Sequence, residues 1–531
     1  MNRFAFILLI FFASAACAQF APQSIHLSQG DRLDEAPPEP RLASNVIIDI
    51  LPSVSASGDL WLATGGGVTH MIADPLILPH GYAFRSYGTA QGLGKGGVSG
   101  LLVTDSIIWA SFAFDTSVGI SGAGGGLAYS RDQGLSWIWL PQPRDRMYNT
   151  DANGFDHVLG YWPTTTNVDN ITYDIAISDS FVWIVSKGGG IRRHIICPED
   201  SCYVNYDDTT GWQVIDTLHF TDGRQLPFHP GDPVDGLYHR TFSVLYDEIE
   251  HALWVGTAAG LLKSTNEGRT WKSYSASSAP NTISGNFVTA LDYQPYDSSV
   301  WAATWRAESP QERYAVSKST DGGLTWRVYL DSAQVTRAIG RFEVVRAHSF
   351  AFDGPVVYVC DDIGLWVSPD NGETWDMLTE DRIFEAGTER RFYYTGIYSA
   401  LNDGARLWVG GVDGLAFTDN GGVSWSVLQT ALPLNSPARD VETYAYPNPF
   451  SPERFDFVKF RYSTSGGAVK ITIYDFAMSK VVELPAVTRS PGEHYEVWDG
   501  RKNGTIVANG TYFYKIEKPG GEVWGKVIVL D

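Results

Sequence analysis

The sequence predicts an all-β fold in which one four-stranded unit recurs along most of the chain and a separate β-module follows it. The first observation is a short apolar strand with one aromatic residue, which recurs at spacings of 48, 74, 71, 47, 57 and 50 residues. The second is an eight-residue segment ending in tryptophan, which occurs five times. The aromatic positions of the recurring strand are Trp61, Trp109, Trp183, Trp254, Trp301, Tyr358 and Trp408.

Each aromatic strand has strand-like neighbours on both sides. An apolar segment such as "NVIIDI" precedes it, and a "GL" strand such as "GLLKS" follows it, before the tryptophan segment turns the chain into a fourth strand. Four short strands repeated seven times predict a seven-bladed β-propeller, here over residues 45–430. The two long spacings require insertions, which we place at 144–166, 197–202 and 217–236, in loops where function is often located.

The eight-residue segments, named the boxes here, are 130–137, 264–271, 319–326, 368–375 and 418–425. In "STDGGLTW", Asp321 can accept hydrogen bonds from turn N–H groups, Gly323 can adopt a positive φ, and Trp326 can pack between sheets. Two boxes carry Asn in place of Asp, which keeps an acceptor and loses the charge, so we expect a structural role. The polar positions are Asp132, Asn266, Asp321, Asp370 and Asn420, and the tryptophans are Trp137, Trp271, Trp326, Trp375 and Trp425.

The box pattern Ser-x-Asp-x-Gly-x-Thr-Trp resembles the Asp-box, or BNR, repeat. The strand texts "LWVGTAAGL" (253–261) and "LWVGGVDGL" (407–415) resemble the two-component regulator propeller repeat. Both resemblances imply propeller blades, and together they cover about residues 45 to 430.

A different module follows a linker at 431–443. "YAYPNPFSP" (444–452) leads into alternating strands separated by turn signals such as "TSGG" and "RKNG", which predicts an Ig-like β-sandwich over 444–531. The segments "YPNPF", "VKITIYD" and "WDGRKNGTIVANGTYFYKI" resemble the Ig-like module of flagellar hook-capping proteins and the C-terminal sorting domains of type IX secretion. The resemblance implies secretion machinery as a partner and release or surface attachment. Sorting domains often end in a basic residue, whereas this sequence ends in Asp531.

The first residues indicate export. Residues 1–18 combine an early arginine, an apolar run and small residues before Ala18, as in a secretory signal peptide, and 19–44 read as an extended linker. A lipoprotein anchored at Cys17 is the alternative. We expect a secreted or cell-surface protein on the exterior of a bacterial outer membrane, with no membrane-spanning segment in the mature chain. Export permits a disulfide between Cys197 and Cys202, whereas a metal site using His194 is the weaker interpretation, and Cys360 fits a buried strand.

Charge and motifs exclude several classes of function. The net charge of −21 argues against nucleic acid and anionic membranes as partners, because both favour Lys and Arg. The sequence contains no zinc-binding His pair, phosphate loop, EF-hand or Ser-His-Asp order, so we expect no cofactor and no metal.

Asp-box proteins include glycoside hydrolases, so a catalytic alternative stays open. A sialidase would need an Arg-Ile-Pro segment, but "AFRSYG" offers only Arg85. A xyloglucanase-like enzyme would use two aspartates as acid and base. Asp49, Asp174 and Asp292 lie at comparable points of predicted first strands and are the candidates, with a polar strand end as the alternative.

The favoured interpretation is a non-enzymatic, exported propeller that binds an extracellular protein, a glycan or a cell-envelope ligand through its loops. Aromatic side chains carry much of the binding energy at interfaces and stack on sugars. The candidates for such contacts lie in the 144–166 insertion, although packing beneath the loop would explain them as well: Tyr148, Phe155, Tyr161 and Trp162.

Overall fold

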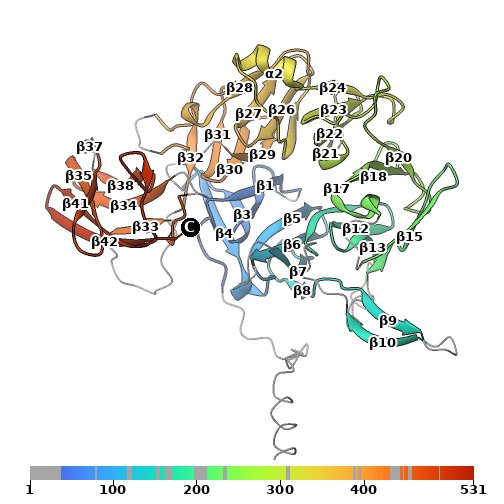
Figure 1. Ribbon diagram of the computed structural model, residues 1–531, viewed down its shortest axis with the longest axis horizontal. Helices are drawn as coiled ribbons and strands as arrows, with labels where there is room; N and C mark the ends of the chain where they lie inside the picture. Colours follow the sequence, from blue (N-terminus) through green and yellow to red (C-terminus); the bar gives the residue numbers. More distant parts are fainter. Residues whose placement is uncertain are drawn as a thin grey trace, which may run out of the picture.

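The computed structural model describes residues 37–530 (Figure 1). The gaps within that range are 55, 78–79, 116–121, 151–155, 162–169, 197–211, 231–235, 307–310, 387–389, 393–395, 431–442, 447, 453–456 and 490. The predicted signal peptide, Cys17 and the predicted disulfide of Cys197 with Cys202 therefore lie outside the described residues.

The described residues form seven four-stranded antiparallel sheets, numbered 1 to 7 in chain order, and each sheet follows the sequence order of its strands. Sheets 1 to 3 comprise β1 Ile47–Pro52, β2 Leu60–Thr64, β3 Gly67–Ala73 and β4 Tyr82–Tyr87; β5 Gly97–Val103, β6 Ile108–Asp115, β7 Gly122–Ser130 and β8 Ile138–Leu140; and β11 Thr172–Ile177, β12 Phe181–Ser186, β13 Gly190–Ile195 and β14 Gln213–Val214. Sheets 4 and 5 comprise β17 Thr241–Asp247, β18 Ala252–Thr257, β19 Gly260–Ser264 and β20 Lys272–Tyr274; and β21 Phe287–Gln294, β22 Ser299–Trp305, β23 Ala315–Ser319 and β24 Arg327–Tyr329. Sheets 6 and 7 comprise β25 Ser349–Asp353, β26 Val356–Asp361, β27 Gly364–Ser368 and β28 Asp376–Leu378; and β29 Ile397–Asn402, β30 Leu407–Gly411, β31 Gly414–Thr418 and β32 Ser426–Leu428.

The sheets stand in a ring (Figure 1). The first strands β1, β5, β11, β17, β21, β25 and β29 contact one another in this order, and β29 contacts β1, which closes the circle. The fold of this region is a β-propeller. A further backbone pair, Glu39 with Ser86, adds the segment before β1 to the outer strand β4.

The hydrophobic core lies between consecutive sheets and is centred on their second strands. Residues of β2 and β18 are buried throughout, because a central strand is covered on both faces, and its apolar run reflects this. The tryptophans of the second strands are completely buried: Trp61, Trp109, Trp183, Trp254, Trp301 and Trp408.

The insertions carry small elements of their own. Strands β9 (Arg146–Thr150) and β10 (Asp156–Tyr161) form a hairpin between sheets 2 and 3, and β15 (Thr217–His219) pairs with β16 (Gln225–Pro227) before sheet 4. Helix α2 (Ser332–Ile339) follows sheet 5.

The sequence patterns did not predict helix α2, although its ends carry ordinary signals. The Asp331 side chain accepts hydrogen bonds from the N–H groups of Ala333 and Gln334, and Gly340 ends the helix with φ 74°. Val335 anchors the helix in the core between sheets 5 and 6.

A second unit follows sheet 7. One sheet contains β33 (Thr443–Tyr446), β34 (Val458–Thr464) and β38 (Gly492–Trp498). The other contains β36 (Lys480–Glu483), β35 (Gly467–Tyr474), β41 (Gly510–Lys518) and β42 (Gly521–Val529), with β37 (Val487–Arg489) pairing to β35 and a small hairpin of β39 (Arg501–Lys502) and β40 (Thr505–Ile506) nearby in sequence. Aromatic and β-branched residues of the two sheets form one shared core, including Phe460, Tyr514 and Trp498.

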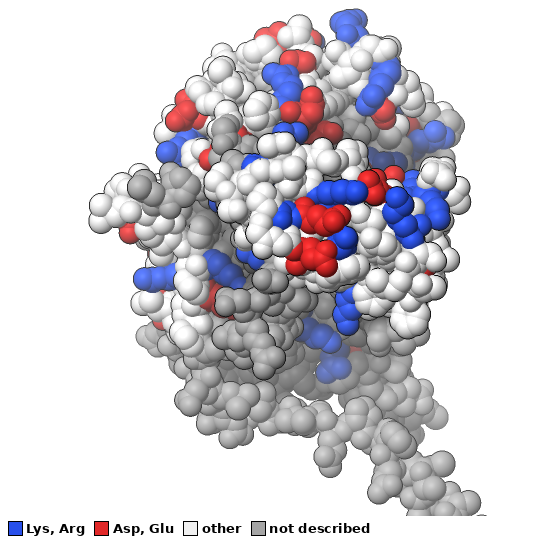
Figure 2. Space-filling model, turned by 90° about the vertical axis from the view of Figure 1, so that its left-hand side faces the viewer, with Lys and Arg blue, Asp and Glu red and all other residues white. Residues whose placement is uncertain are grey.

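This C-terminal unit lies beside the rim of the ring (Figure 1). Lys459 pairs with the buried Asp413 of sheet 7, and Tyr495 donates a hydrogen bond of 3.0 Å to Gln429 Oε1. Seen from this side, acidic and basic side chains are interspersed and form no large field of one sign (Figure 2). Among the described residues, no helix has the length and apolarity needed to cross a membrane.

Candidate functional site

The box of sheet 5 forms a self-contained turn between β23 and β24. Asp321 Oδ1 accepts hydrogen bonds from the Ser319 hydroxyl (2.8 Å) and the Thr325 N–H (2.9 Å), and Oδ2 accepts one from the Thr325 hydroxyl (2.6 Å). Gly322 and Gly323 have φ of 66° and 89°, a conformation that glycine adopts without cost. A Cβ on Gly323 would also lie 2.8 Å from the Trp254 ring of the preceding sheet, so this turn requires glycine for two reasons.

The other four boxes repeat this hydrogen-bond network. Where Asn replaces Asp, the amide NH₂ donates to the hydroxyl instead, at 2.8 Å from Asn266 to Thr270 and 2.7 Å from Asn420 to Ser424. Partial burial opposes ionisation of the three box aspartates, but the turn hydroxyl and N–H groups outweigh it and lower their pKa: Asp132, Asp321 and Asp370. Each network closes within its own turn, on five different sheets.

The box tryptophans are buried and pack between neighbouring sheets. Trp137 of sheet 2 lies edge-on to Trp61 of sheet 1 with ring centroids 6.4 Å apart, and Trp326 of sheet 5 lies edge-on to Trp254 of sheet 4 at 6.0 Å. Such edge-to-face packing adds to the energy of apolar burial.

A cation covers the second-strand tryptophan in several sheets and reaches the next box. Lys263, the cross-strand partner of Trp254, lies 4.6 Å from that ring and donates to the Gly322 carbonyl at 3.0 Å. Lys318, the partner of Trp301, donates to Asn371 Oδ1 at 2.7 Å. In sheet 3, Arg193 donates to the Glu267 carbonyl in the same way. We name these contacts the cation latches.

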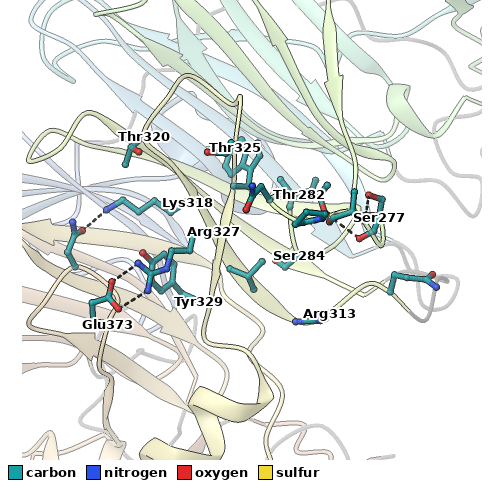
Figure 3. A pocket seen from close by; sticks show the side chains of 18 of the residues that line it. Ser277, Thr282, Ser284, Arg313, Lys318, Thr320, Thr325, Arg327, Tyr329 and Glu373 are labelled. Carbon is teal, nitrogen blue, oxygen red and sulfur yellow. Dashed lines mark hydrogen bonds and ion pairs between the residues drawn. The ribbon is translucent and has the colours of Figure 1, made fainter.

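One large cavity, of about 1190 Å³, lies at the rim between sheets 5 and 6 (Figure 3). Four of its charged side chains are paired: Arg327 contacts Glu373 at 2.6 and 2.7 Å, and Lys318 bridges Asp297 and Asn371. The contacts of Arg327 with Glu373 and of Lys318 with Asn371 join the two sheets.

A second cavity, of about 830 Å³, occupies the centre of the ring and is lined by residues of all seven first strands. Six of these strands contain a β-bulge near their start, and examples are the register shifts between Ile47 and Asp49 and between Thr172 and Asp174. A bulge redirects the side chains beside it, which is why such irregularities accompany binding sites. We name this cavity the central cavity.

All three predicted catalytic candidates line the central cavity, one from each of sheets 1, 3 and 5. Surrounding protein disfavours their charged form and raises the pKa of Asp49 to about 6 and those of Asp174 and Asp292 to about 7. Their mutual electrostatic repulsion acts in the same direction.

The backbone engages these carboxylates to different extents. Asp174 accepts the Ile175 N–H on Oδ1 and the Val244 N–H of sheet 4 on Oδ2, both at 2.8 Å, so it braces two first strands. Asp49 accepts the Ile50 N–H, and Asp292 accepts the Tyr293 N–H.

The three positions are not fully comparable, contrary to the prediction. Asp49 and Asp174 pair with Ala63 and Val185, directly after the bulge, whereas Asp292 pairs with Trp301. In sheets 1 and 3 that tryptophan-paired position belongs to Leu51 and Ala176. Asp292 therefore lies two residues deeper, about 7 Å along its strand.

Aromatic side chains form an arc beside the cavity, and four of them line it: Tyr173, Phe242, His348 and Tyr398. Phe287 and Trp305, the last residue of the second strand β22, connect Phe242 to His348 in this arc. Consecutive ring centroids lie 5.7, 4.3, 6.0, 6.3 and 5.0 Å apart, and every ring is partly exposed. We name this arc the aromatic collar; its members are Tyr173, Phe242, Phe287, Trp305, His348 and Tyr398.

One end of the collar is charged. His348 Nε2 lies 2.7 Å from Asp362 Oδ1, and Arg346 lies 3.5 Å from the same carboxylate. The His348 hydrogen bond holds the pKa of Asp362 below its usual value. Burial and the charge of Asp362 raise the pKa of Tyr398.

The aromatic collar was missed by the sequence analysis, which placed the binding aromatics in the 144–166 insertion. Tyr148 and Tyr161 lie in β9 and β10, but their side chains are outside the described residues, as are Phe155 and Trp162. The signal for the collar was an aromatic ring at the start of successive first strands, as in "TYDI", "TFSV" and "IYSA".

Two further sequence interpretations concern arginine and metal. The lining of the central cavity includes no Arg or Lys among the described residues, and Arg85 lies on the fourth strand β4, so no sialidase-like arginine cluster surrounds this cavity. No group of three or more His, Cys, Asp or Glu side chains in the described part of the chain has the arrangement needed for a metal ion.

No family model and no curated protein matches the chain. The similar proteins were found among solved structures. A GH74 xyloglucanase from Xanthomonas campestris is similar with 12% identity and a TM-score of 0.45, over 73% of this chain and 53% of the xyloglucanase. An ancestral GH74 enzyme is similar with 13% identity and a TM-score of 0.45, over 93% of this chain and 63% of the enzyme. The WD40 β-propeller domain of Doa1 is similar with 11% identity and a TM-score of 0.37, over 73% and 97% of the two chains. The chain thus spans about half the length of the xyloglucanase.

Proposed function

We propose that this chain is an exported, non-catalytic β-propeller that binds an extracellular protein, a glycan or a cell-envelope ligand at the aromatic collar. The collar is the observation that supports this most directly. It joins six partly exposed rings from sheets 3 to 7, and four of them line the central cavity. Binding sites are typically concave, lined by aromatic side chains, and equipped with a few polar groups, and this cavity has all three properties.

Binding fits the local chemistry better than hydrolysis. Both carboxylate oxygens of Asp174 accept backbone N–H groups, which gives this residue a structural task. An inverting glycosidase needs an acid and a base about 6.5–9.5 Å apart across a bound sugar. Asp174 and Asp292 come from non-adjacent sheets and from different depths of the central cavity.

The remaining domain assignments complete the proposal. Residues 45–430 are seven blades whose boxes are structural Asp-box turns, and 444–531 is an Ig-like module for secretion, sorting or surface attachment. Residues 1–18 are the signal peptide that sends the chain to the cell exterior. The aromatic residues of the 144–166 insertion extend the binding surface of the loops.

Substitutions in the aromatic collar test the proposal. The variants Phe242→Ala and Tyr398→Ala should each weaken retention of purified protein on a glycan array or on isolated cell envelopes by tenfold or more. Trp139→Ala is the matched control, because this half-exposed tryptophan lies on the outer strand β8. Equal retention of the collar variants and the wild type would rule out the collar as the binding site.

A glycoside hydrolase is the second candidate, and one observation favours it. Asp174 and Asp292 have pKa values raised to about 7, the range in which a carboxyl group acts as a general acid at neutral pH. Release of reducing sugar from xyloglucan, lost in both Asp174→Asn and Asp292→Asn, would establish this alternative in place of a binding role.

A further inference from the structure

The charge of the central cavity has one sign. Its lining includes the carboxyl groups of Asp49, Asp174 and Asp292, and the described lining residues contain neither Lys nor Arg. His348 is the remaining lining side chain that can carry a positive charge, and it is already paired with Asp362. The carboxyl groups therefore face the cavity without a cationic partner among the described lining residues.

The opening of the cavity favours the same kind of guest. The faces of aromatic rings carry negative electrostatic potential and attract ammonium and guanidinium groups within about 6 Å. Asp49 and Asp174 lie about one residue below the level of the collar. Tyr173 of the collar immediately precedes Asp174, and Ile48 occupies the equivalent position before Asp49. A cation passing the rings would meet these carboxylates next.

The size of the cavity permits such a guest. The volume of about 830 Å³ accommodates a small molecule or the end of a long side chain.

We propose that the central cavity binds an organic cation, whose ammonium or guanidinium group passes the aromatic collar and pairs with Asp49, Asp174 and Asp292. The cation belongs either to a free polyamine or to a Lys or Arg side chain of a polypeptide. This inference rests on the proposed function, because it names the chemistry recognised at the same opening.

The ionisation of the cavity supports this chemistry and sets its pH dependence. The titratable and charged groups around it are the three aspartates, His348 with its partners Asp362 and Arg346, the collar tyrosines Tyr173 and Tyr398, and the buried Cys360 thiol. Burial raises the pKa of Cys360 to about 12, and the charge of Asp49 adds to this effect, so the thiol stays neutral between pH 5.5 and pH 8. With pKa values of about 6 to 7, the aspartates are largely neutral at pH 5.5 and largely charged at pH 8. A bound cation stabilises their charged forms, so its binding releases protons near pH 6.5 and strengthens as the pH rises.

Calorimetric titration of the full chain with spermidine and with a trilysine peptide tests the proposal, and 1,8-octanediol serves as the neutral probe. We expect at least one of the two cations to bind at pH 8, at least tenfold more weakly at pH 5.5, with proton release in buffers of different ionisation enthalpy. Binding of spermidine alone identifies a free amine, and binding of the peptide alone identifies a polypeptide side chain. Binding of octanediol as tightly as the cations, or binding of neither cation, would overturn the proposal.

Matched charge variants separate a site from general attraction to an acidic protein. The triple variant Asp49→Asn, Asp174→Asn, Asp292→Asn should lose cation binding at least tenfold, while the surface variant Asp105→Asn, Asp353→Asn, Asp419→Asn should retain it. Equal losses of cation binding in the two triple variants would mean that binding depends only on net charge, and the proposal would fail. If the cavity triple variant does not fold, the single variant Asp292→Asn replaces it in this comparison. If Phe242→Ala loses retention on glycans or envelopes while no cation binds, the binding function stands and the cation inference fails.

Discussion

Asn45 and Thr430 exchange two hydrogen bonds across 385 residues of sequence, at the junction where the ring closes. Asn45 Nδ2 donates to the Thr430 carbonyl at 3.1 Å, and the Thr430 N–H donates to Asn45 Oδ1 at 2.7 Å. These bonds join the segment before sheet 1 to the segment after sheet 7, so the two ends of the propeller hold each other. Closing so long a loop is entropically costly, and a hydrophobic cluster shared by sheets 1 and 7, which includes Ile47 and Trp408, stabilises the same junction.

Loss of this closure should destabilise the whole propeller. Asn45→Ala removes one donor and one acceptor and leaves the partly buried N–H and carbonyl of Thr430 without these partners, at a cost of about 2 kcal/mol. Urea denaturation should show this decrease, whereas Asn402→Ala, which removes a bond to the nearby Gly404, should change stability less. An unfolding curve identical to that of the wild type would show that other contacts close the ring.

The box of sheet 5 should tolerate asparagine but not alanine. Asp321→Asn keeps the Oδ1 acceptor and reverses the bond to the Thr325 hydroxyl, as Asn266 does in sheet 4, so we expect a change within about 0.5 kcal/mol. Asp321→Ala removes three hydrogen bonds at an exposed turn and should cost about 1–2 kcal/mol. If asparagine were as damaging as alanine in chemical denaturation, the charge of Asp321 would have a role beyond the turn.

The cation latch of Lys318 joins three parts of the molecule. Its ammonium lies 2.5 Å from Asp297 Oδ2, 2.7 Å from Asn371 Oδ1 and 5.0 Å from the Trp301 ring, and burial lowers its pKa. Lys318→Met should cost about 3 kcal/mol, because it leaves the Asp297 carboxylate without its buried partner.

The double variant Lys318→Met with Asp297→Asn provides the control for this prediction. Neutralising the carboxylate should restore part of the lost stability, as measured by a double-mutant cycle in urea. Strictly additive effects of the two substitutions would show that the ion pair between Lys318 and Asp297 does not stabilise the fold.

The sequence predicted the elements that repeat and missed the relationships between repeats. The tryptophan of the second strand and the box recur at a fixed place in each unit, so their strands could be located from spacing. Helix α2 occurs once, between two units, so the repeat pattern could not predict it. The cation latches depend on the cross-strand register that pairs Trp254 with Lys263, and register is decided by tertiary packing.

In the central cavity, too, the sequence predicted individual residues and missed their spatial relationships. The three aspartates could be named because they lie in predicted first strands, yet the depth of Asp292 follows from the strand register that pairs it with Trp301. The collar joins residues as distant in sequence as Tyr173 and Tyr398, which only the closed ring brings to one opening.

Neutralising Asp292 should stabilise the protein at high pH and have little effect at low pH. The pKa of Asp292 is raised from 3.8 to about 7 in the folded chain, chiefly by burial, so the folded state binds this proton more tightly than the unfolded state. The stability that it contributes is complete below pH 3.8 and is lost as the pH rises to about 7. Such a pKa difference corresponds to at most about 4 kcal/mol, and water in the cavity reduces it. Asn keeps the acceptor for the Tyr293 N–H, so thermal unfolding should show the variant above the wild type at pH 8, with the difference shrinking toward pH 4. A difference that stayed constant with pH would mean that Asp292 is ionised in the folded protein at every pH tested.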